Sequence, residues 1–144
     1  LLREDWGVAA DVWSVTSFTE LRRDGMAAER WNLLHPEEEP RTSYVEECLD
    51  GTAGPIVAAT DYMRAYPDQI RPYVPRRFKV LGTDGFGRSD TREELRRYFE
   101  VNSEYVTLAA LKALADEGKI DRGKVSEAIR HYGIDADKPH PWLT

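Results

Sequence analysis

The spacing of apolar and polar positions divides the chain into strand-like segments separated by helix-like ones. Residues 9–17 are rich in β-branched and aromatic side chains and predict a strand. The run 54–60 is small and apolar without interruption, which is typical of a strand covered on both faces. A third strand is expected over 77–81. Strands that alternate with helical patterns in this way indicate an open α/β sheet.

Helical spacing and capping residues define the segments between these strands. The first helix begins at the capping sequence 17–20 and continues through Trp31, with an interruption expected at Asp24-Gly25. It is followed by a short helix over 44–49. Residues 62–74 also have helical spacing, but the two prolines within them should break or kink that helix.

The C-terminal half contains the clearest helical patterns. Residues 91–99 follow a glycine-rich loop whose last residues, Ser89 and Asp90, favour capping a helix. The helix over 104–117 is apolar almost all round, so we expect it to be buried on two sides. An amphipathic helix follows, capped by Asp121. We therefore expect one domain over residues 1–133 and a C-terminal tail over 134–144.

The first residues resemble the end of a helix rather than the start of a protein. Residues 1–6 read as a last helical turn, and Gly7 supplies the left-handed stop. We therefore expect a chain that begins inside a domain and a sheet that lacks its first strand. A companion polypeptide would then cover the exposed edge.

Composition and charge narrow the classes of function. The net charge is −6 with both signs mixed along the chain, which argues against binding of nucleic acid or anionic membrane. No apolar run approaches the roughly 20 residues that span a bilayer. The single cysteine, Cys48, excludes an internal disulfide and agrees with a reducing compartment. These features indicate a soluble protein located in the cytoplasm.

The glycine-rich loop after the third strand is the best candidate for a functional segment. Loops at the carboxyl ends of parallel strands face clefts or partner surfaces. Its backbone amides could hold phosphate, yet the spacing fits neither the P-loop nor the dinucleotide fingerprint. The alternative is that its glycines permit turns while its phenylalanine enters an apolar pocket or a neighbouring subunit. The candidate residues are Asp84, Gly85, Phe86, Gly87, Arg88, Ser89 and Asp90.

No catalytic, cofactor-binding or metal-binding residue can be assigned from the sequence. Asp84-Gly85 resembles part of the metal-diphosphate motif of thiamine enzymes, but residues 111–113, where the second half should lie, offer no oxygen ligands. His35 lies beside three glutamates, but a solvated loop is the simpler interpretation. No nucleophile, base and orienting group can be assembled.

The glycine loop and five other stretches carry a resemblance to a known family. Gly82-Thr83-Asp84-Gly85-Phe86-Gly87-Arg88-Ser89-Asp90 is similar to the C-terminal domain of the homodimeric bacterial pyruvate dehydrogenases, within the wider transketolase family. The other matching stretches are 11–21, 29–32, 34–36, 59–63 and 134–138. They occur in the same order along the chain.

This resemblance implies a fold and a function. The fold is a three-layer α/β sandwich with a mostly parallel sheet flanked by helices. The enzyme decarboxylates pyruvate with thiamine diphosphate and Mg²⁺ and passes the acetyl unit to the lipoyl group of a dihydrolipoyl acyltransferase component. The cofactors are bound by preceding domains, and the C-terminal domain supports the homodimer.

Two hypotheses follow. In one, the chain is a non-catalytic structural and dimerisation domain of such an enzyme. In the other, it is a free-standing α/β module whose glycine-rich loop binds an anion or a protein partner. The expected lack of a first strand favours the former.

Overall fold

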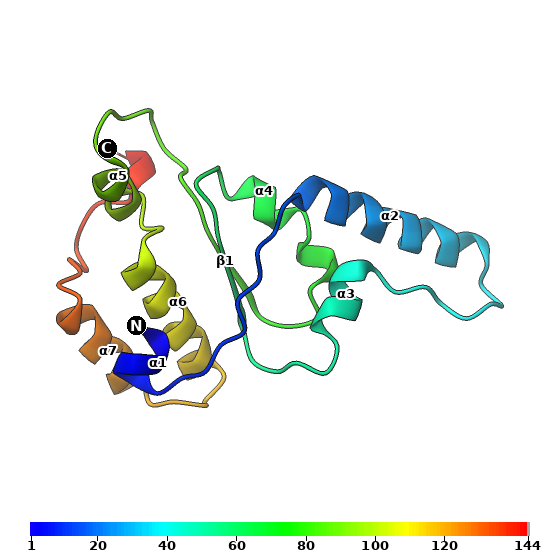
Figure 1. Cartoon of the computed structure of the whole chain (residues 1–144), viewed down its shortest axis with the longest axis horizontal. Helices are drawn as coiled ribbons and strands as arrows, with labels where there is room; N and C mark the ends of the chain where they lie inside the picture. The colour runs from blue at the N-terminus through cyan, green and yellow to red at the C-terminus, as the bar shows by residue number, and fades with distance from the viewer. Residues whose placement is uncertain (144) are drawn as a thin grey trace.

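The computed structural model describes residues 1–143 and shows a short parallel sheet between two groups of helices (Figure 1). The strands are β1 (Ile56–Ala59) and β2 (Phe78–Leu81). The helices are α1 (Leu2–Trp6), α2 (Phe18–Leu34), α3 (Tyr44–Leu49), α4 (Ala65–Asp68), α5 (Arg92–Tyr98), α6 (Ser103–Asp116) and α7 (Arg122–His131), with 3₁₀ turns at Arg71–Tyr73 and Pro141–Leu143. Among these described helices, none is both long and apolar enough to cross a membrane.

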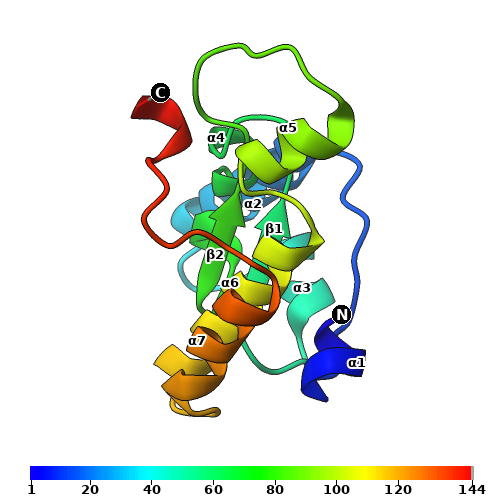
Figure 2. The ribbon, with the colours of Figure 1, turned by 90° about the vertical axis from the view of Figure 1, so that its left-hand side faces the viewer.

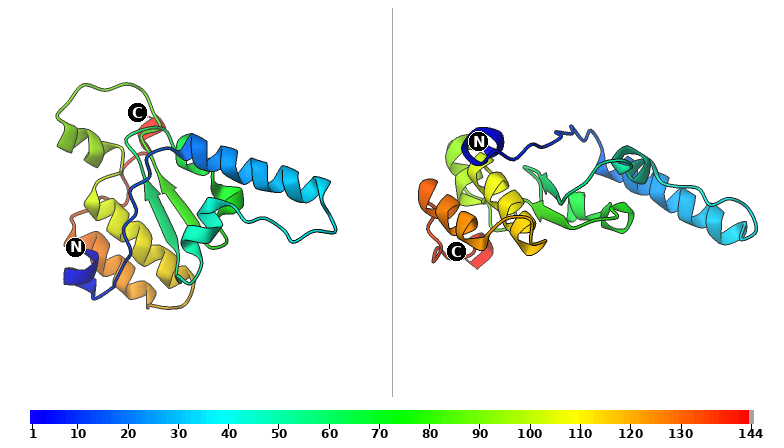
Figure 3. Two further views of the ribbon diagram at one scale, coloured as in Figure 1. Left: turned by 45° about the vertical axis from the view of Figure 1, so that its right-hand side comes forward. Right: turned by 90° about the horizontal axis from the view of Figure 1, so that it is seen from below.

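The sheet has a different apolar cluster on each face, as the α/β prediction requires. β1 and β2 pair in parallel, with Ile56 opposite Phe78 and Ala59 opposite Leu81. Phe78 and Val80 face the cluster formed with α2 and α3, whereas Leu81 belongs to the cluster formed with α5 and α6. This alternation follows from the two-residue period of a strand. The views in Figure 3 show the strands between the two helical groups.

Helix α6 is buried on two sides, as its nearly continuous apolar surface predicts. One side packs against the strands and the other against α7. Leu111 is completely buried, and the cluster around it includes Val125 and Ala128 of α7. Helix α1 joins this group, where Trp6 Nε1 donates a hydrogen bond to the Tyr132 hydroxyl at 2.7 Å. Gly7 ends α1 in the left-handed conformation, with φ 65°, as expected.

The strand predicted over 9–17 is wrong. The segment is an extended connection between α1 and α2 (Figure 1). Within the described part of the chain, β1 pairs only with β2, so no third strand offers this segment ladder hydrogen bonds. Val12 is 95% exposed and Trp13 56% exposed. The β-branched and aromatic side chains of residues 9–17 therefore lie on an exposed segment and not in a strand of this sheet.

The interruption predicted at Asp24-Gly25 is also wrong, because α2 runs continuously through both residues. Gly25 is buried against the ring of Tyr73, and a Cβ at this position would lie only 2.4 Å from Tyr73 Cε2. The glycine thus permits close packing between two segments and does not mark a turn. The break predicted at the prolines of 62–74 is present, since this region forms α4 and a separate 3₁₀ turn.

We predict that Gly25→Ala lowers the free energy of unfolding by about 1–3 kcal/mol, because the methyl group must displace a buried ring. Urea denaturation measures this directly. Gly87→Ala is the matched control, since a Cβ there meets nothing within 4 Å, and its effect should stay within about 0.5 kcal/mol. Equal midpoints for the two variants would contradict this account of Gly25.

Candidate functional site

The loops that follow β1 and β2 are joined to each other at the carboxyl edge of the sheet. Thr83 donates twice to the first loop, from its amide to the Tyr62 carbonyl and from its hydroxyl to the Asp61 carbonyl, each at 2.9 Å. A Cβ at Gly82 would lie 2.7 Å from the Arg64 amide nitrogen. Glycine is therefore required at residue 82, because the two backbones approach too closely for a side chain.

Asp84 fixes the start of the candidate loop. Its Oδ2 accepts a hydrogen bond from the Arg64 amide at 3.1 Å and lies 3.3 Å from Arg64 Nε. Both side chains are mostly buried, with exposures of 28% for Arg64 and 22% for Asp84. A partly buried, charge-assisted contact of this kind holds its groups more firmly than an exposed ion pair does. The carboxylate of Asp84 is thus occupied in anchoring the loop.

The tip of the loop exposes an aromatic ring. Gly85 has φ 146° and lies beneath the C-terminal segment, where a Cβ would be 3.0 Å from the Pro141 carbonyl oxygen. Phe86 is 74% exposed, so its ring does not enter an apolar pocket formed by the described residues 1–143. Its insertion into a neighbouring subunit remains a prediction. Beyond the exposed Gly87, the Arg88 guanidinium lies over the Tyr98 ring, 4.3 Å from the centroid.

The end of the loop caps α5 differently from the prediction. Ser89 and Asp90 are exposed, and Asp90 Oδ1 accepts a hydrogen bond from the Thr91 amide at 2.8 Å. Thr91 is the N-cap, with its hydroxyl accepting from the Glu94 amide at 3.3 Å. The helix therefore begins one residue later than a cap at Asp90 would allow. Asp90 orients the cap residue instead of capping the helix itself.

A second ion pair connects α5 to the loop after β1. Arg96 donates to both carboxylate oxygens of Asp61, from Nε at 3.0 Å and from Nη2 at 2.6 Å. The hydrogen bond from Arg96 holds the pKa of Asp61 below its ordinary value of 3.8, with the nearby charges of Arg96 and Arg92 acting in the same direction. The same contact raises the pKa of Arg96. Together the two ion pairs attach both loops and α5 to one another.

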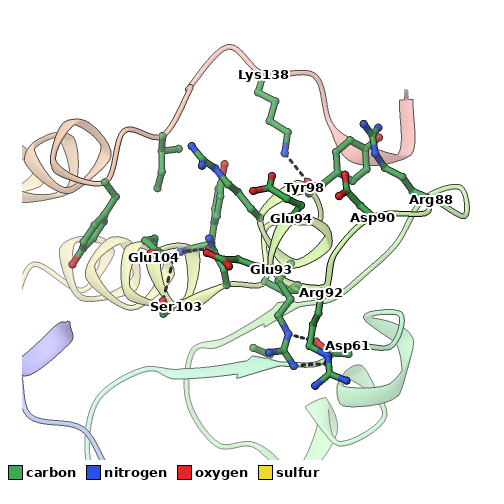
Figure 4. Close-up of a pocket in the computed structure, with 18 of the residues that line it drawn as sticks. Asp61, Arg88, Asp90, Arg92, Glu93, Glu94, Tyr98, Ser103, Glu104 and Lys138 are labelled. Atoms are coloured by element: carbon green, nitrogen blue, oxygen red, sulfur yellow. Dashed lines mark hydrogen bonds and ion pairs between the residues drawn. The ribbon is translucent and has the colours of Figure 1, made fainter.

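The surface around α5 is an open depression of mixed charge (Figure 4). Arginine and lysine side chains alternate with aspartate and glutamate, so neither sign is concentrated there. The labelled charged residues are Asp61, Arg88, Asp90, Arg92, Glu93, Glu94, Glu104 and Lys138. Such a surface suits contact with another protein surface better than capture of a strongly charged ligand.

The three histidines and the single cysteine of the chain lie outside the candidate loop. The His35 ring stacks on Trp31 with centroids 4.4 Å apart, whereas the nearby glutamates 37–39 are exposed. Cys48 is a free, half-buried thiol. His131 Nε2 lies 4.0 Å from the Asp5 carboxylate, and His140 Nδ1 accepts from the Trp142 amide at 3.4 Å. None of these side chains lies among the candidate loop residues.

The residues described do not fit a metal-diphosphate site. Asp84 is already paired with Arg64, and Leu111 is buried among apolar side chains of α6 and α7. No group of three or more His, Cys, Asp or Glu side chains within residues 1–143 is arranged to hold a metal ion. Oxygen ligands are what Mg²⁺ requires. The described residues therefore offer no site of this kind.

Comparison with known families identifies the fold. A family model described as the transketolase-like TK C-terminal domain matches residues 1–102, well over half of the chain. The chain belongs to the transketolase-like C-terminal domain family. The resemblance inferred from the glycine loop is confirmed, as is its α/β fold class.

The relatives of this transketolase-like C-terminal domain described here share one name. It is 62% identical over 141 residues to the "Pyruvate dehydrogenase E1 component" of Cupriavidus necator, which covers 98% of this chain. Proteins of the same name match at 62% identity over 142 residues in Pseudomonas aeruginosa, covering 98% of this chain, and at 54% over 144 in Escherichia coli K12, covering 99%. The chain spans only 16% of the length of each of these relatives.

Sequence reasoning located the loop of this transketolase-like C-terminal domain but missed the residues that hold it. Arg64, Arg96 and Lys138 were not singled out. Arg64 contacts the loop, Arg96 connects α5 to Asp61, and Lys138 contacts the end of α5. Each contact joins segments at least 20 residues apart. Two signals were available, since Asp61 and Lys138 each lie in a stretch that carries the family resemblance.

We predict that the Asp61–Arg96 pair contributes stability only where Asp61 is ionised. Because the folded-state pKa is lowered, the contribution is complete above the unfolded value of 3.8 and is lost as the pH falls through the folded value. The difference in urea midpoint between the wild type and Asp61→Asn should therefore be constant above about pH 5 and shrink below about pH 4. Asp11→Asn, at an exposed position, is the control and should show no such trend. A pH-independent difference for Asp61→Asn would contradict the assignment.

Proposed function

We propose that this chain is the C-terminal, non-catalytic part of a thiamine diphosphate-dependent pyruvate dehydrogenase E1 enzyme. The observation that carries the proposal is the identity of 62% over nearly the whole chain to proteins named as E1 components. Because the chain corresponds to 16% of their length, the reacting groups belong to other parts of the polypeptide. Thiamine diphosphate and Mg²⁺ are bound there, since the described residues do not fit them.

In this proposal the complete enzyme acts on pyruvate in the cytoplasm. It decarboxylates pyruvate and transfers the acetyl unit to the lipoyl group of the dihydrolipoyl acyltransferase component. The alternative was a free-standing module whose loop binds an anion or a protein partner, and its anion-binding form has less support. The mixed charges around α5 do not concentrate positive potential, and the carboxylate of Asp84 lies at the start of the loop.

The role of this chain within the enzyme is contact with the preceding domains and a second subunit. Several large apolar side chains are exposed on the segments near the carboxyl edge of the sheet, which is unusual for a surface that meets only water. They are Tyr62, Met63, Tyr66, Phe86, Trp142 and Leu143. Phe86 projects from a loop held at both ends, which is the arrangement of an aromatic anchor.

We predict that pyruvate decarboxylation, measured with added thiamine diphosphate, Mg²⁺ and an artificial electron acceptor, requires the full-length protein. The isolated 144-residue chain should give no turnover above the rate without protein. This result is expected because the described residues provide no nucleophile, base or metal site. Turnover by the isolated chain would overturn the proposal, and so would an inactive full-length protein that binds its cofactors.

We predict that Phe86→Ser weakens assembly of the full-length protein while leaving the isolated chain almost unchanged. Truncation of a central aromatic anchor costs about 2 kcal/mol or more of association free energy, whereas an exposed substitution changes folding by within about 0.5 kcal/mol. Sedimentation measures the first effect and urea denaturation of the isolated chain the second.

The control for this experiment is Lys124→Ser, which alters an exposed residue of α7. It should leave both measurements at the wild-type values. If Phe86→Ser leaves assembly as intact as this control does, Phe86 is not an anchor between parts of the enzyme.

A further inference from the structure

The C-terminal segment returns from α7 toward α5 and the start of the candidate loop, as Figures 1 and 2 show. It leaves α7 and crosses to the carboxyl edge of the sheet, ending beside α5. Lys138 makes the central contact, in which its ammonium donates to the Tyr98 carbonyl at 2.6 Å. The same ammonium lies 3.5 Å from Glu100 Oε1 and 5.1 Å from the centroid of the Tyr98 ring. A positive charge at the C-terminus of a helix is favourable, because the last carbonyls carry partial negative charge.

The contact of Lys138 lies at a strained turn, because Glu100 follows α5 in an unusual backbone conformation. Glu100 has φ 62°, and among the described residues it is the single non-glycine with positive φ. The Val101 amide donates a hydrogen bond to the Arg96 carbonyl at 2.9 Å, and this bond closes the end of α5. In helix ends of this kind the residue in the left-handed conformation, here Glu100, is usually glycine. A residue other than glycine persists there when its surroundings hold it. The ion pair with Lys138 is one such constraint.

A second contact lies further along the segment, at Pro141. This proline is fully buried, and its carbonyl accepts a hydrogen bond from the Tyr98 hydroxyl at 3.4 Å. The same carbonyl oxygen approaches Gly85 so closely that a Cβ at residue 85 would lie 3.0 Å from it. Since Arg88 also lies on the Tyr98 ring, this tyrosine contacts both the loop and the C-terminal segment. The segment therefore touches the loop at one end and the helix after it at the other.

The segment lies outside the main apolar core, although Pro141 is itself buried. Within residues 1–143, the three hydrophobic clusters contain no side chain from 134–143. Releasing the segment would thus break a few hydrogen bonds and one ion pair and expose Pro141, while the clusters around the sheet stay intact. Local opening of this kind requires less free energy than global unfolding.

We propose that residues 134–143 form a strap that holds the loop 84–90 and α5 in place, with Lys138 as the positioning residue. The strap determines how firmly Phe86 is held at the surface of this chain. This inference concerns the chain itself and does not depend on the enzyme proposed above.

The test is Lys138→Met in the full-length protein, read as the rate of tryptic cleavage between Arg88 and Ser89 and as hydrogen exchange of residues 92–101. Removing the ammonium should increase both rates about tenfold, the size expected for a hydrogen bond to a charged group. The substitution does not remove a tryptic site, because residue 138 precedes Pro139. Lys138→Arg retains the charge and donors and should restore rates close to wild type.

Lys124→Met is the matched control, since it removes an exposed lysine of α7 and should leave both rates unchanged. Glu100→Gln provides a second route if Lys138→Met impairs folding, because it removes the ion pair with little change in volume. It should raise the cleavage rate by a smaller factor than Lys138→Met. The proposal is overturned if folded Lys138→Met or Glu100→Gln is cleaved at the wild-type rate, or if Lys138→Arg is cleaved as fast as Lys138→Met.

Discussion

The fold around the candidate site depends on the connection between the two loops at the carboxyl edge of the sheet. Two strands of four residues each make a short ladder, and the pairing extends beyond it through hydrogen bonds from Thr60 to Leu81 and from Thr83 to Tyr62. Asp84 then binds the backbone and side chain of Arg64. Because these contacts are partly buried, solvent screens them less than it screens surface pairs. They fix where the chain leaves the sheet, and therefore where the glycine loop and α5 lie.

Elements specified by local sequence could be predicted, whereas those that depend on distant neighbours could not. A nearly continuous apolar surface predicts helix α6, and a run of small apolar residues between turn residues predicts β1. The prediction of a helix interruption at Gly25 was wrong because glycine is needed there to make room for the ring of Tyr73, which lies 48 residues further along the chain. Residues 9–17 have the composition of a strand, but a strand exists only where a neighbour pairs with it.

The candidate loop shows the same division between local and distant information. Three glycines over residues 82–87 and their place after a strand were sufficient to predict a tight loop at the carboxyl edge. What each glycine does there was not predictable, since Gly82 accommodates the backbone of Arg64 and Gly85 accommodates that of Pro141. An ion pair between exposed side chains leaves no periodic signal, so Arg96 could not be distinguished from other surface cations. Lys138 makes its contacts from a partly buried position, with partners that lie far away in the sequence.

An exposed aromatic ring on a firmly held loop has a different meaning from one on a mobile loop. Ordering a flexible loop upon association costs conformational entropy, which reduces the affinity that its contacts can provide. Here Asp84 holds one end of the loop, and Arg88 against Tyr98 holds the other. Phe86 is therefore already oriented before any contact is made, while its ring still has apolar area to bury. Because neither sign of charge predominates around α5, shape and apolar burial would have to supply most of the affinity of a protein contact made at this surface.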